Sequence, residues 1–435
     1  MSNIIYATDR AFAQKMDKAD PLRKFRNRFH FPKNTVEERN PDASGKGGNK
    51  IYFCGNSLGL QPKTTKKHIQ NLLDNWQERA VEGHFEGTHS FMAFPEILNE
   101  KMAHIVGAKP NEIAVMNTLT VNLHLLMVSF YRPTKERYKI LIDYNPFPSD
   151  RYAIASQLRY HGFDPQTAII EPKPKSGSAL IETEDILQTI ENEGDSIALI
   201  LIGGINYYSG QLYNLEKITD AGHKKGCIVG FDLAHAAGNV SLKLHDVGCD
   251  FAAWCTYKYL NAGPGAIGAI FVHERHAHAT LPRFEGWWGF EKATRFKMTP
   301  DFVPIGGAQS WQMSTPPVLS MAGIRASLEI FEEAGFDNII KKSRLLTGYL
   351  EFLLINIPTD TIRIITPEDP EQRGCQLSIK VRGADKSLFY KLLDNGVVGD
   401  WREPDVIRVA PAPLYNGFEE VYNFVEILKK MLKIG

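Results

Sequence analysis

Short apolar runs without polar alternation recur through the middle of the chain, and amphipathic stretches separate them. The runs cover residues 111–116, 139–142, 197–202, 227–231, 251–257 and 269–272. Strands that are buried on both faces carry continuous apolar runs of this kind, whereas half-exposed strands alternate. The pattern therefore predicts an α/β fold, in which helices cover both faces of a mainly parallel sheet.

The pattern changes near Pro316-Pro317, which marks a boundary. Beyond it we expect long helices at 318–331 and 339–355, strands at 362–365, 376–381 and 406–409, and helices at 386–395 and after Phe418. This is an α+β segment, and a helical lead-in over residues 1–30 is expected to pack on it. We predict a large α/β domain over 51–315 and a smaller, discontinuous α+β domain made of 1–50 and 316–435.

Two successive strands of the large domain each end at an ionisable residue. The run at 227–231 stops at Asp232, and the run at 251–257 is followed by Lys258. Ligands bind outside the carboxyl ends of parallel strands, so both side chains are expected in one pocket. A carboxylate that keeps a pyridine nitrogen protonated, beside an amine that condenses with an aldehyde, suits pyridoxal 5'-phosphate (PLP). The alternative is a snorkelling lysine and a helix-capping aspartate.

Two other positions suit the same cofactor. Thr120 lies at a predicted helix start, where hydroxyl and backbone N–H groups bind anions, although an ordinary threonine near a helix cap fits equally well. Phe147, in a stretch over residues 145–150 that we expect to be irregular, offers a ring face for stacking on a pyridine.

Composition narrows the class of protein. The 435 residues include 50 basic and 50 acidic ones, so the absence of net charge favours neither nucleic acid nor an anionic membrane as a partner. The five cysteines have no C-x-x-C spacing and suggest a reducing compartment. The N-terminus lacks the apolar run of a signal peptide, and we expect a cytoplasmic protein. The histidines at 273, 276 and 278 are interpreted as a solvated helix, and no metal site is predicted.

At this point the sequence resembles the kynureninase family, PLP enzymes of fold type I in the aspartate aminotransferase superfamily. The matching segments are 52–62, 118–122, 147–150, 231–235, 257–263, 286–289, 294–298 and 407–411. They occur in order over nearly the whole chain. The resemblance implies hydrolysis of the Cβ–Cγ bond of L-kynurenine or 3-hydroxy-L-kynurenine, giving an anthranilate and L-alanine, within tryptophan degradation and NAD biosynthesis.

The resemblance also implies roles for individual residues. Lys258, Tyr257 and Asp232 would be catalytic. The cofactor would contact Leu119, Thr120, Phe147, Pro148, Ser149, Asp150, Gly203, Asp232, His235, Tyr257, Lys258, Trp287 and Thr315, and the substrate Ser57, His84, Ser314, Thr315 and Arg408. Trp287 resembles a contact made from a partner subunit, which implies a homodimer with shared active sites. Gly203 and Thr315 stand where one version of the pattern has Ser and Asn, so ring-hydroxyl preference stays open.

Three rival readings remain. A cysteine desulfurase of the same fold carries His directly before the lysine and a cysteine on a mobile loop, whereas this chain has Tyr257 and no obvious loop cysteine. An aminotransferase would interconvert amino and keto acids. A non-catalytic PLP-fold binding module would have no reason to keep Lys258, Asp232 and Arg408 together.

Overall fold

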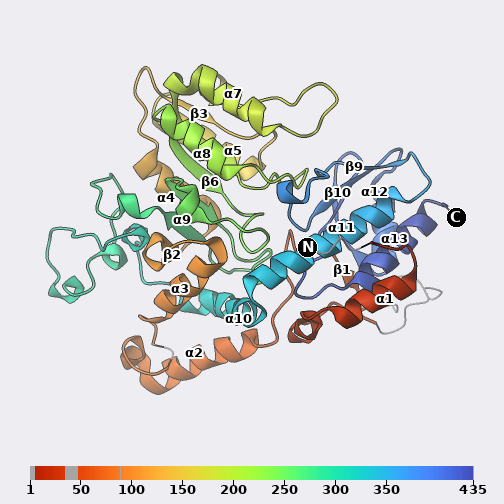
Figure 1. Cartoon of the computed structure of the whole chain (residues 1–435). Coiled ribbons are helices and arrows are strands. Elements are labelled where there is room, and N and C mark those ends of the chain that lie inside the picture. Colours follow the sequence, from red (N-terminus) through yellow and green to blue (C-terminus); the bar gives the residue numbers. More distant parts are fainter. Residues whose placement is uncertain (1–4, 35–47, 89, 435) are drawn as a thin grey trace. The chain divides into compact units, whose positions relative to one another are not determined.

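The computed structural model describes residues 5–34, 48–88 and 90–434, and these form two compact units (Figure 1). The first unit contains the described residues of Met1–Thr64, Tyr208–Gln211 and Glu329–Gly435, and the second contains those of Thr65–Tyr207 and Leu212–Leu328. The domain division predicted from the sequence, with 51–315 in the large domain, has different bounds and stays a prediction.

A seven-stranded sheet in the order β2-β8-β7-β6-β5-β3-β4 forms the centre of the second unit. Its strands are β2 (Ile113–Val115), β3 (Lys139–Leu141), β4 (Ile169–Ile170), β5 (Ile197–Gly203), β6 (Ile228–Asp232), β7 (Phe251–Trp254) and β8 (Ala269–Val272). The pairs from β7 through β4 are all parallel, and only β8 runs against its neighbours. The predicted mainly parallel sheet is confirmed.

Helices cover this sheet because its strands have no polar face. All of β7 and β8 is buried, and α4 packs against both strands while α8 packs against β6 (Figure 1). Phe130 of α4 stacks on Phe251 of β7, with ring centroids 5.0 Å apart. The helices here are α2 (Thr65–Arg79), α3 (Phe94–Val106), α4 (Leu119–Phe130), α5 (Pro148–Tyr160), α6 (Pro165–Ala168), α7 (Thr183–Glu193), α8 (Leu215–Lys224) and α9 (Leu244–Val247), and α10 (Val318–Ala334) begins here.

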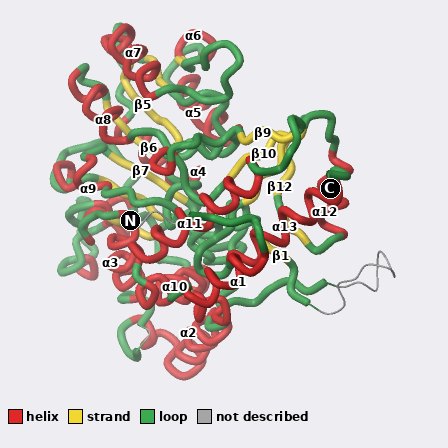
Figure 2. Tube along the Cα trace, turned by 45° about the vertical axis from the view of Figure 1, so that its right-hand side comes forward, coloured by secondary structure: helices red, strands yellow, loops and turns green. Residues whose placement is uncertain are grey.

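The first unit is built on antiparallel pairing. Its four-stranded sheet has the order β12-β13-β10-β9, and a separate parallel pair joins β1 to β11. Helix α13 packs against both α1 and α11 (Figure 2). The elements are α1 (Arg10–Ala19), β1 (Ile51–Tyr52), α11 (Phe336–Ile355), β9 (Ile362–Ile364), β10 (Leu377–Val381), α12 (Lys386–Asp394), β11 (Val397–Val398), β12 (Asp400–Arg402), β13 (Val406–Val409) and α13 (Phe418–Met431). No helix in the described part of the chain is both long and apolar enough to span a bilayer.

Two local predictions were wrong. Strand β7 ends at Trp254 rather than at residue 257, because the next residues bond within their own loop: Ala262 N donates to Thr256 O at 3.0 Å, and Asn261 N to Lys258 O at 2.9 Å. The stretch around residue 148, expected to be irregular, begins α5, since a proline at the first helical position is already shaped for a helix.

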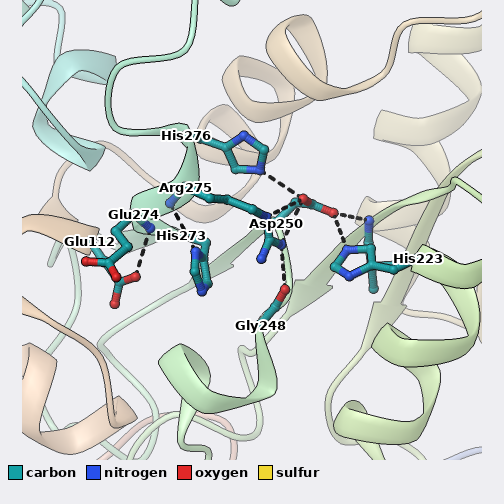
Figure 3. A network of polar contacts seen from close by, with 9 residues as sticks. Glu112, His223, Gly248, Asp250, His273, Glu274, Arg275 and His276 are labelled. Atoms are coloured by element: carbon teal, nitrogen blue, oxygen red, sulfur yellow. Dashed lines mark hydrogen bonds and ion pairs between the residues drawn. The ribbon is translucent and has the colours of Figure 1, made fainter.

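A buried carboxylate ties three segments of the second unit together (Figure 3). Asp250, which is 3% exposed, precedes β7 and accepts hydrogen bonds of 2.9 Å each from His223 of α8, His276 and Arg275. It also accepts one of 2.8 Å from Val229 N of β6. Burial raises the pKa of Asp250, but these hydrogen bonds and the Arg275 charge outweigh burial and hold it well below its ordinary value. The histidines expected on a solvated helix thus include one that anchors the sheet.

We predict that Asp250→Ala lowers the free energy of unfolding by about 1 to 3 kcal/mol, because Arg275, two imidazoles and the Val229 N–H lose the buried carboxylate that accepts their hydrogen bonds. The measurement is urea unfolding at pH 7. A carboxyl whose pKa is lower when folded stabilises the protein above its unfolded pKa, so the difference should shrink as pH falls below about 4.

Asp246→Ala is the matched control, since Asp246 is exposed in the neighbouring helix α9. It should change the unfolding free energy by less than about 0.5 kcal/mol. Equal urea midpoints for the two variants would show that the Asp250 contacts contribute nothing to stability.

Candidate active site

Asp232 lies at the carboxyl end of β6 in the middle of the seven-stranded sheet, with Gly203 of β5 as its register partner. Its side chain is buried, and Oδ1 accepts a hydrogen bond of 2.7 Å from Ala234 N. Burial raises the pKa of Asp232, while that bond, a hydrogen bond with Asp150 and the charge of Lys258 oppose the rise. The Asp232 carboxyl therefore lies at the carboxyl ends of the parallel strands, where this class of fold binds ligands.

Lys258 lies at the same end of the sheet, on the loop that follows β7. Its Nζ lies 3.0 Å from Nε2 of His235, a buried residue three positions after Asp232. The charge of Lys258 also lowers the pKa of Asp232, so the amine and the carboxyl belong to one group of side chains. The structure thus brings these three predicted residues together, although Lys258 comes from a loop rather than a strand end.

Two further carboxyls stand beside Asp232. Asp150, in the first turn of α5, has its pKa raised well above its ordinary value, first by burial and then by the charge of Asp232 and a hydrogen bond with it. Asp143, just past β3, is buried, and burial raises its pKa to about 7. Its Oδ1 accepts a hydrogen bond of 3.3 Å from Gly203 N. Burial, and then repulsion between the ionised forms of Asp232 and its two neighbours, therefore favours the protonated form of Asp143 and Asp150.

Two hydroxyls meet at the starts of two helices. Thr120 is the second residue of α4 and Ser149 the second residue of α5, and their hydroxyl oxygens lie 2.9 Å apart. Leu119 and Pro148 are the first residues of the same helices. The first turn of a helix has free N–H groups and the positive end of the helix dipole, so paired helix starts with hydroxyls suit a phosphate.

Two aromatic residues of the predicted site are neighbours in sequence of residues described above: Phe147 precedes Pro148, and Tyr257 precedes Lys258. Phe147 caps α5 and is 46% exposed, and its ring meets the ring of Tyr207 edge to face, with centroids 5.4 Å apart. Tyr257 precedes Lys258, whose Nζ is 6.0 Å from the Tyr257 ring centroid. Burial, then the neighbouring Cys255, raises the pKa of Tyr257.

Four predicted residues of the second unit form no hydrogen bond with this group in the part of the chain that the structure describes. His84 packs edge to face on Phe91, with ring centroids 5.5 Å apart. Trp287 is 41% exposed, and Ser314 and Thr315 are exposed.

Ser57 and Arg408 belong to the first unit, where a residue not predicted for the site joins them. Asp400 accepts a hydrogen bond of 2.8 Å from the Ser57 hydroxyl and forms an ion pair with Arg408, whose side chain is 1% exposed. Asp400 and Asp143 are thus the polar residues that sequence analysis missed. Asp143 had a signal, since it follows an apolar strand as Asp232 does. Asp400 had none, because its pairing with Arg408 depends on strand register.

A possible metal group lies away from these residues, and Figure 3 shows part of it. Glu112, His245 and His273 have ligand atoms within 4.8 Å of one another. However, Glu112 Oε1 already accepts hydrogen bonds from His245 at 3.0 Å and Glu274 N at 2.8 Å, and His273 Nδ1 accepts one from Arg275 N at 3.1 Å. We interpret the group as a hydrogen-bonded cluster, and the expected lack of a metal stays a prediction.

The donor set of the second unit fits PLP. An amine, a buried carboxyl, paired helix-start hydroxyls and an exposed ring match the aldehyde, ring nitrogen, phosphate and ring face of that cofactor.

Solved structures support the fold. A cysteine desulfurase from Escherichia coli matches with a TM-score of 0.73 at 17% identity, covering 95% of this chain and 98% of that one. C-DES, solved with glycine linked covalently to its PLP cofactor, matches with a TM-score of 0.74 at 16% identity, covering 88% and 97%. The predicted fold, PLP fold type I, is confirmed.

Sequence comparison is more specific. Residues 339–428 match the model of the kynureninase C-terminal domain. Kynureninases from Myxococcus xanthus, at 53% identity over 98% of both chains, and Koribacter versatilis, at 52% identity over 98% of both, are similar over nearly the full length. A third, from Flavobacterium psychrophilum, is 51% identical over 98% of this chain and 99% of its own. With half of its residues identical to theirs along almost its whole length, the chain belongs to the kynureninase family.

Proposed function

We propose that the protein is a PLP-dependent hydrolase that cleaves the Cβ–Cγ bond of L-kynurenine, 3-hydroxy-L-kynurenine or both, releasing L-alanine and the corresponding anthranilate. The observation that carries the proposal is the group formed by Lys258, His235 and Asp232 at the sheet edge of a chain that belongs to this family. Bound PLP supplies the electron sink for the charge left when the Cα proton and the Cβ–Cγ bond are broken.

Lys258 and Asp232 have complementary tasks. Lys258 Nζ would hold the aldehyde end of the cofactor and would then accept the proton at the substrate Cα. Asp232 would hold the proton on the ring nitrogen. Asp150 supports Asp232, because its raised pKa keeps a proton available for the hydrogen bond between the two carboxyls. His235, 3.0 Å from Lys258 Nζ, orients the amine.

The remaining cofactor contacts surround these groups. Thr120 and Ser149 would donate hydrogen bonds from their hydroxyls to the phosphate, beside the free N–H groups of the two helix starts. Phe147 would stack on the ring. The other proposed contacts are Leu119, Pro148, Gly203, Tyr257, Trp287 and Thr315.

Tyr257 is suited to deliver a proton. Its raised pKa keeps the phenol protonated at neutral pH, so it can donate to Cβ after the bond breaks. Arg408 would bind the substrate carboxylate, since a buried guanidinium offers a planar pair of donors. Ser57, His84, Ser314 and Thr315 complete the proposed substrate contacts.

Exposed apolar side chains support a homodimer. Ile69, Leu73 and Trp76 lie at helical spacing on α2 and are 37%, 36% and 61% exposed, and Trp287 is also exposed. A stripe of this kind on a folded unit favours association. In the proposed dimer Trp287 contacts the cofactor of the partner subunit. We further propose a cytoplasmic enzyme of tryptophan degradation and NAD biosynthesis, with a large domain over 51–315.

The rivals are less well supported. Four of the five cysteines are buried, and Cys54 is partly buried, so none resembles an exposed loop nucleophile. Parallel assays with kynurenine and with 3-hydroxykynurenine distinguish the proposed hydrolase from an aminotransferase and from a binding module. Alanine and a fluorescent anthranilate indicate hydrolysis, a keto acid would indicate an aminotransferase, and no turnover by protein that binds PLP would indicate a binding module.

We predict that the PLP-loaded protein is yellow and that borohydride reduction fixes the cofactor on the peptide that contains Lys258. Lys258→Ala should lose the visible absorbance, the fixation and at least about 99% of turnover, because the amine acts both as the attachment point and as the base. Absorbance spectra and mass spectrometry of the digested protein test this. Lys224→Ala, an exposed lysine of α8, is the control and should match the wild type. Fixation at any other lysine would remove Lys258 from its proposed role.

We predict that Arg408→Ala raises KM for kynurenine, with a loss in kcat/KM equivalent to about 2 to 5 kcal/mol, because a buried charged contact to the carboxylate is removed. Arg408→Lys should recover part of the loss, since it restores the charge but not the fork. Arg363→Ala, an exposed arginine of β9, is the control. Wild-type kinetics for Arg408→Ala would place the substrate carboxylate elsewhere.

We predict that Trp76→Glu weakens the dimer by about 2 kcal/mol or more, because tryptophans in interface centres often contribute that much. Sedimentation at several protein concentrations measures the dissociation constant. Ile355→Glu, on a helix of the first unit with 68% of Ile355 exposed, is the control. An unchanged dimer in Trp76→Glu would exclude the α2 stripe as the interface.

A further inference from the structure

Arg408, the proposed receptor for the substrate carboxylate, already contacts a carboxylate of its own chain. Strands β12 and β13 pair antiparallel, and the register places Asp400 directly opposite Arg408. Residues opposite each other in this way have side chains on the same face. The NH2 group of Arg408 makes a close ion pair with Oδ2 of Asp400, and the side chains are 1% and 14% exposed.

One oxygen of Asp400 collects three donors. Besides Arg408, Oδ2 accepts the Ser57 hydroxyl at 2.8 Å and the Arg402 guanidinium at 3.0 Å. Ser57 is itself fixed, because its N–H donates to Cys54 O at 3.0 Å and Cys54 bridges to Ala410 beyond β13. The carboxylate is therefore held by Ser57 and Arg402, and it can hold the Arg408 side chain in one direction.

Two guanidinium groups of this cluster meet one carboxylate. Asp400 contributes one negative charge, and Arg402 and Arg408 contribute one positive charge each, so the three groups carry a net charge of one positive. Cys54 adds no charge at neutral pH, because burial and then the charge of Asp400 raise its pKa to about 11. Asp400 thus offsets part of the cost of burying Arg408.

We propose that Asp400 is a positioning residue for substrate binding: anchored by Ser57 and Arg402, it orients the guanidinium of Arg408 toward the carboxylate of the amino-acid substrate. The inference rests on the proposed function, in which Arg408 binds that carboxylate. It adds a residue that touches neither substrate nor cofactor. Its effect is on substrate affinity, and it acts through Arg408.

Steady-state kinetics of the PLP-loaded Asp400→Asn enzyme with kynurenine test the proposal. The amide keeps the shape but loses the charge that anchors Arg408, so KM should rise about tenfold, as expected for coupled neighbours, while kcat stays within about twofold of wild type. Asp400→Glu keeps the charge and should recover part of the rise. A lowered KM would show that Asp400 competes with the substrate for Arg408, and it would overturn the positioning role.

A double-mutant cycle with Arg408→Ala separates this role from a purely structural one. If Asp400 acts through Arg408, the KM of the double variant should equal that of Arg408→Ala, whereas multiplied effects would overturn the proposal. Asp405→Asn is the matched control, since Asp405 pairs with Lys380 at 3.3 Å in the same sheet and should leave KM unchanged. If wild-type enzyme turns over kynurenine but Arg408→Ala is normal, the assignment of Arg408 fails. A wild type without kynurenine turnover contradicts the proposed function itself.

Discussion

The burial of the Asp232 carboxyl beside the charge of Lys258 is the constraint on which the candidate site depends. Burial alone would make Asp232 a neutral acid, and the Ala234 N–H, the Asp150 carboxyl and the Lys258 charge all act against that tendency. Parallel pairing of β5, β6 and β7 makes this balance possible, because it brings the carboxyl ends of several strands together at one end of the sheet. The protonation state of Asp232 therefore depends on the topology of the sheet.

Gly203 shows how closely this edge is shared. It pairs with Asp232 across β5 and β6, and its N–H donates to Asp143 on its other side. A Cβ at this position would lie 3.6 Å from Asp143 Oδ2, which is an ordinary van der Waals contact. The fold would thus accept a small side chain here, and the backbone does not require glycine. A residue with a side chain would instead change the chemistry of the space between Asp143 and Asp232.

Sequence analysis succeeded where one strand carried its own signal. The apolar run before Asp232 predicted both the strand and the carboxyl at its end, and β8 was predicted at its observed bounds. It failed where structure depends on contacts between segments. The aromatic run before Lys258 is as apolar as a strand, but hydrogen bonds within the loop end β7 at Trp254. Asp400 gave no signal because its partner, Arg408, is set by strand register.

Comparison of Asp250 with Asp400 indicates why the two carboxylates have different roles although both form ion pairs with arginine side chains. Asp250 uses both oxygens, and its donors come from α8, β6 and the turn after β8, so the contacts hold separate segments together. The three donors of Asp400 meet on Oδ2, and two of them, Arg402 and Arg408, lie on the same β12–β13 pair as Asp400 itself. These contacts act on the direction of the Arg408 side chain more than they join separate segments. This is the reason to assign Asp400 a positioning role for substrate binding.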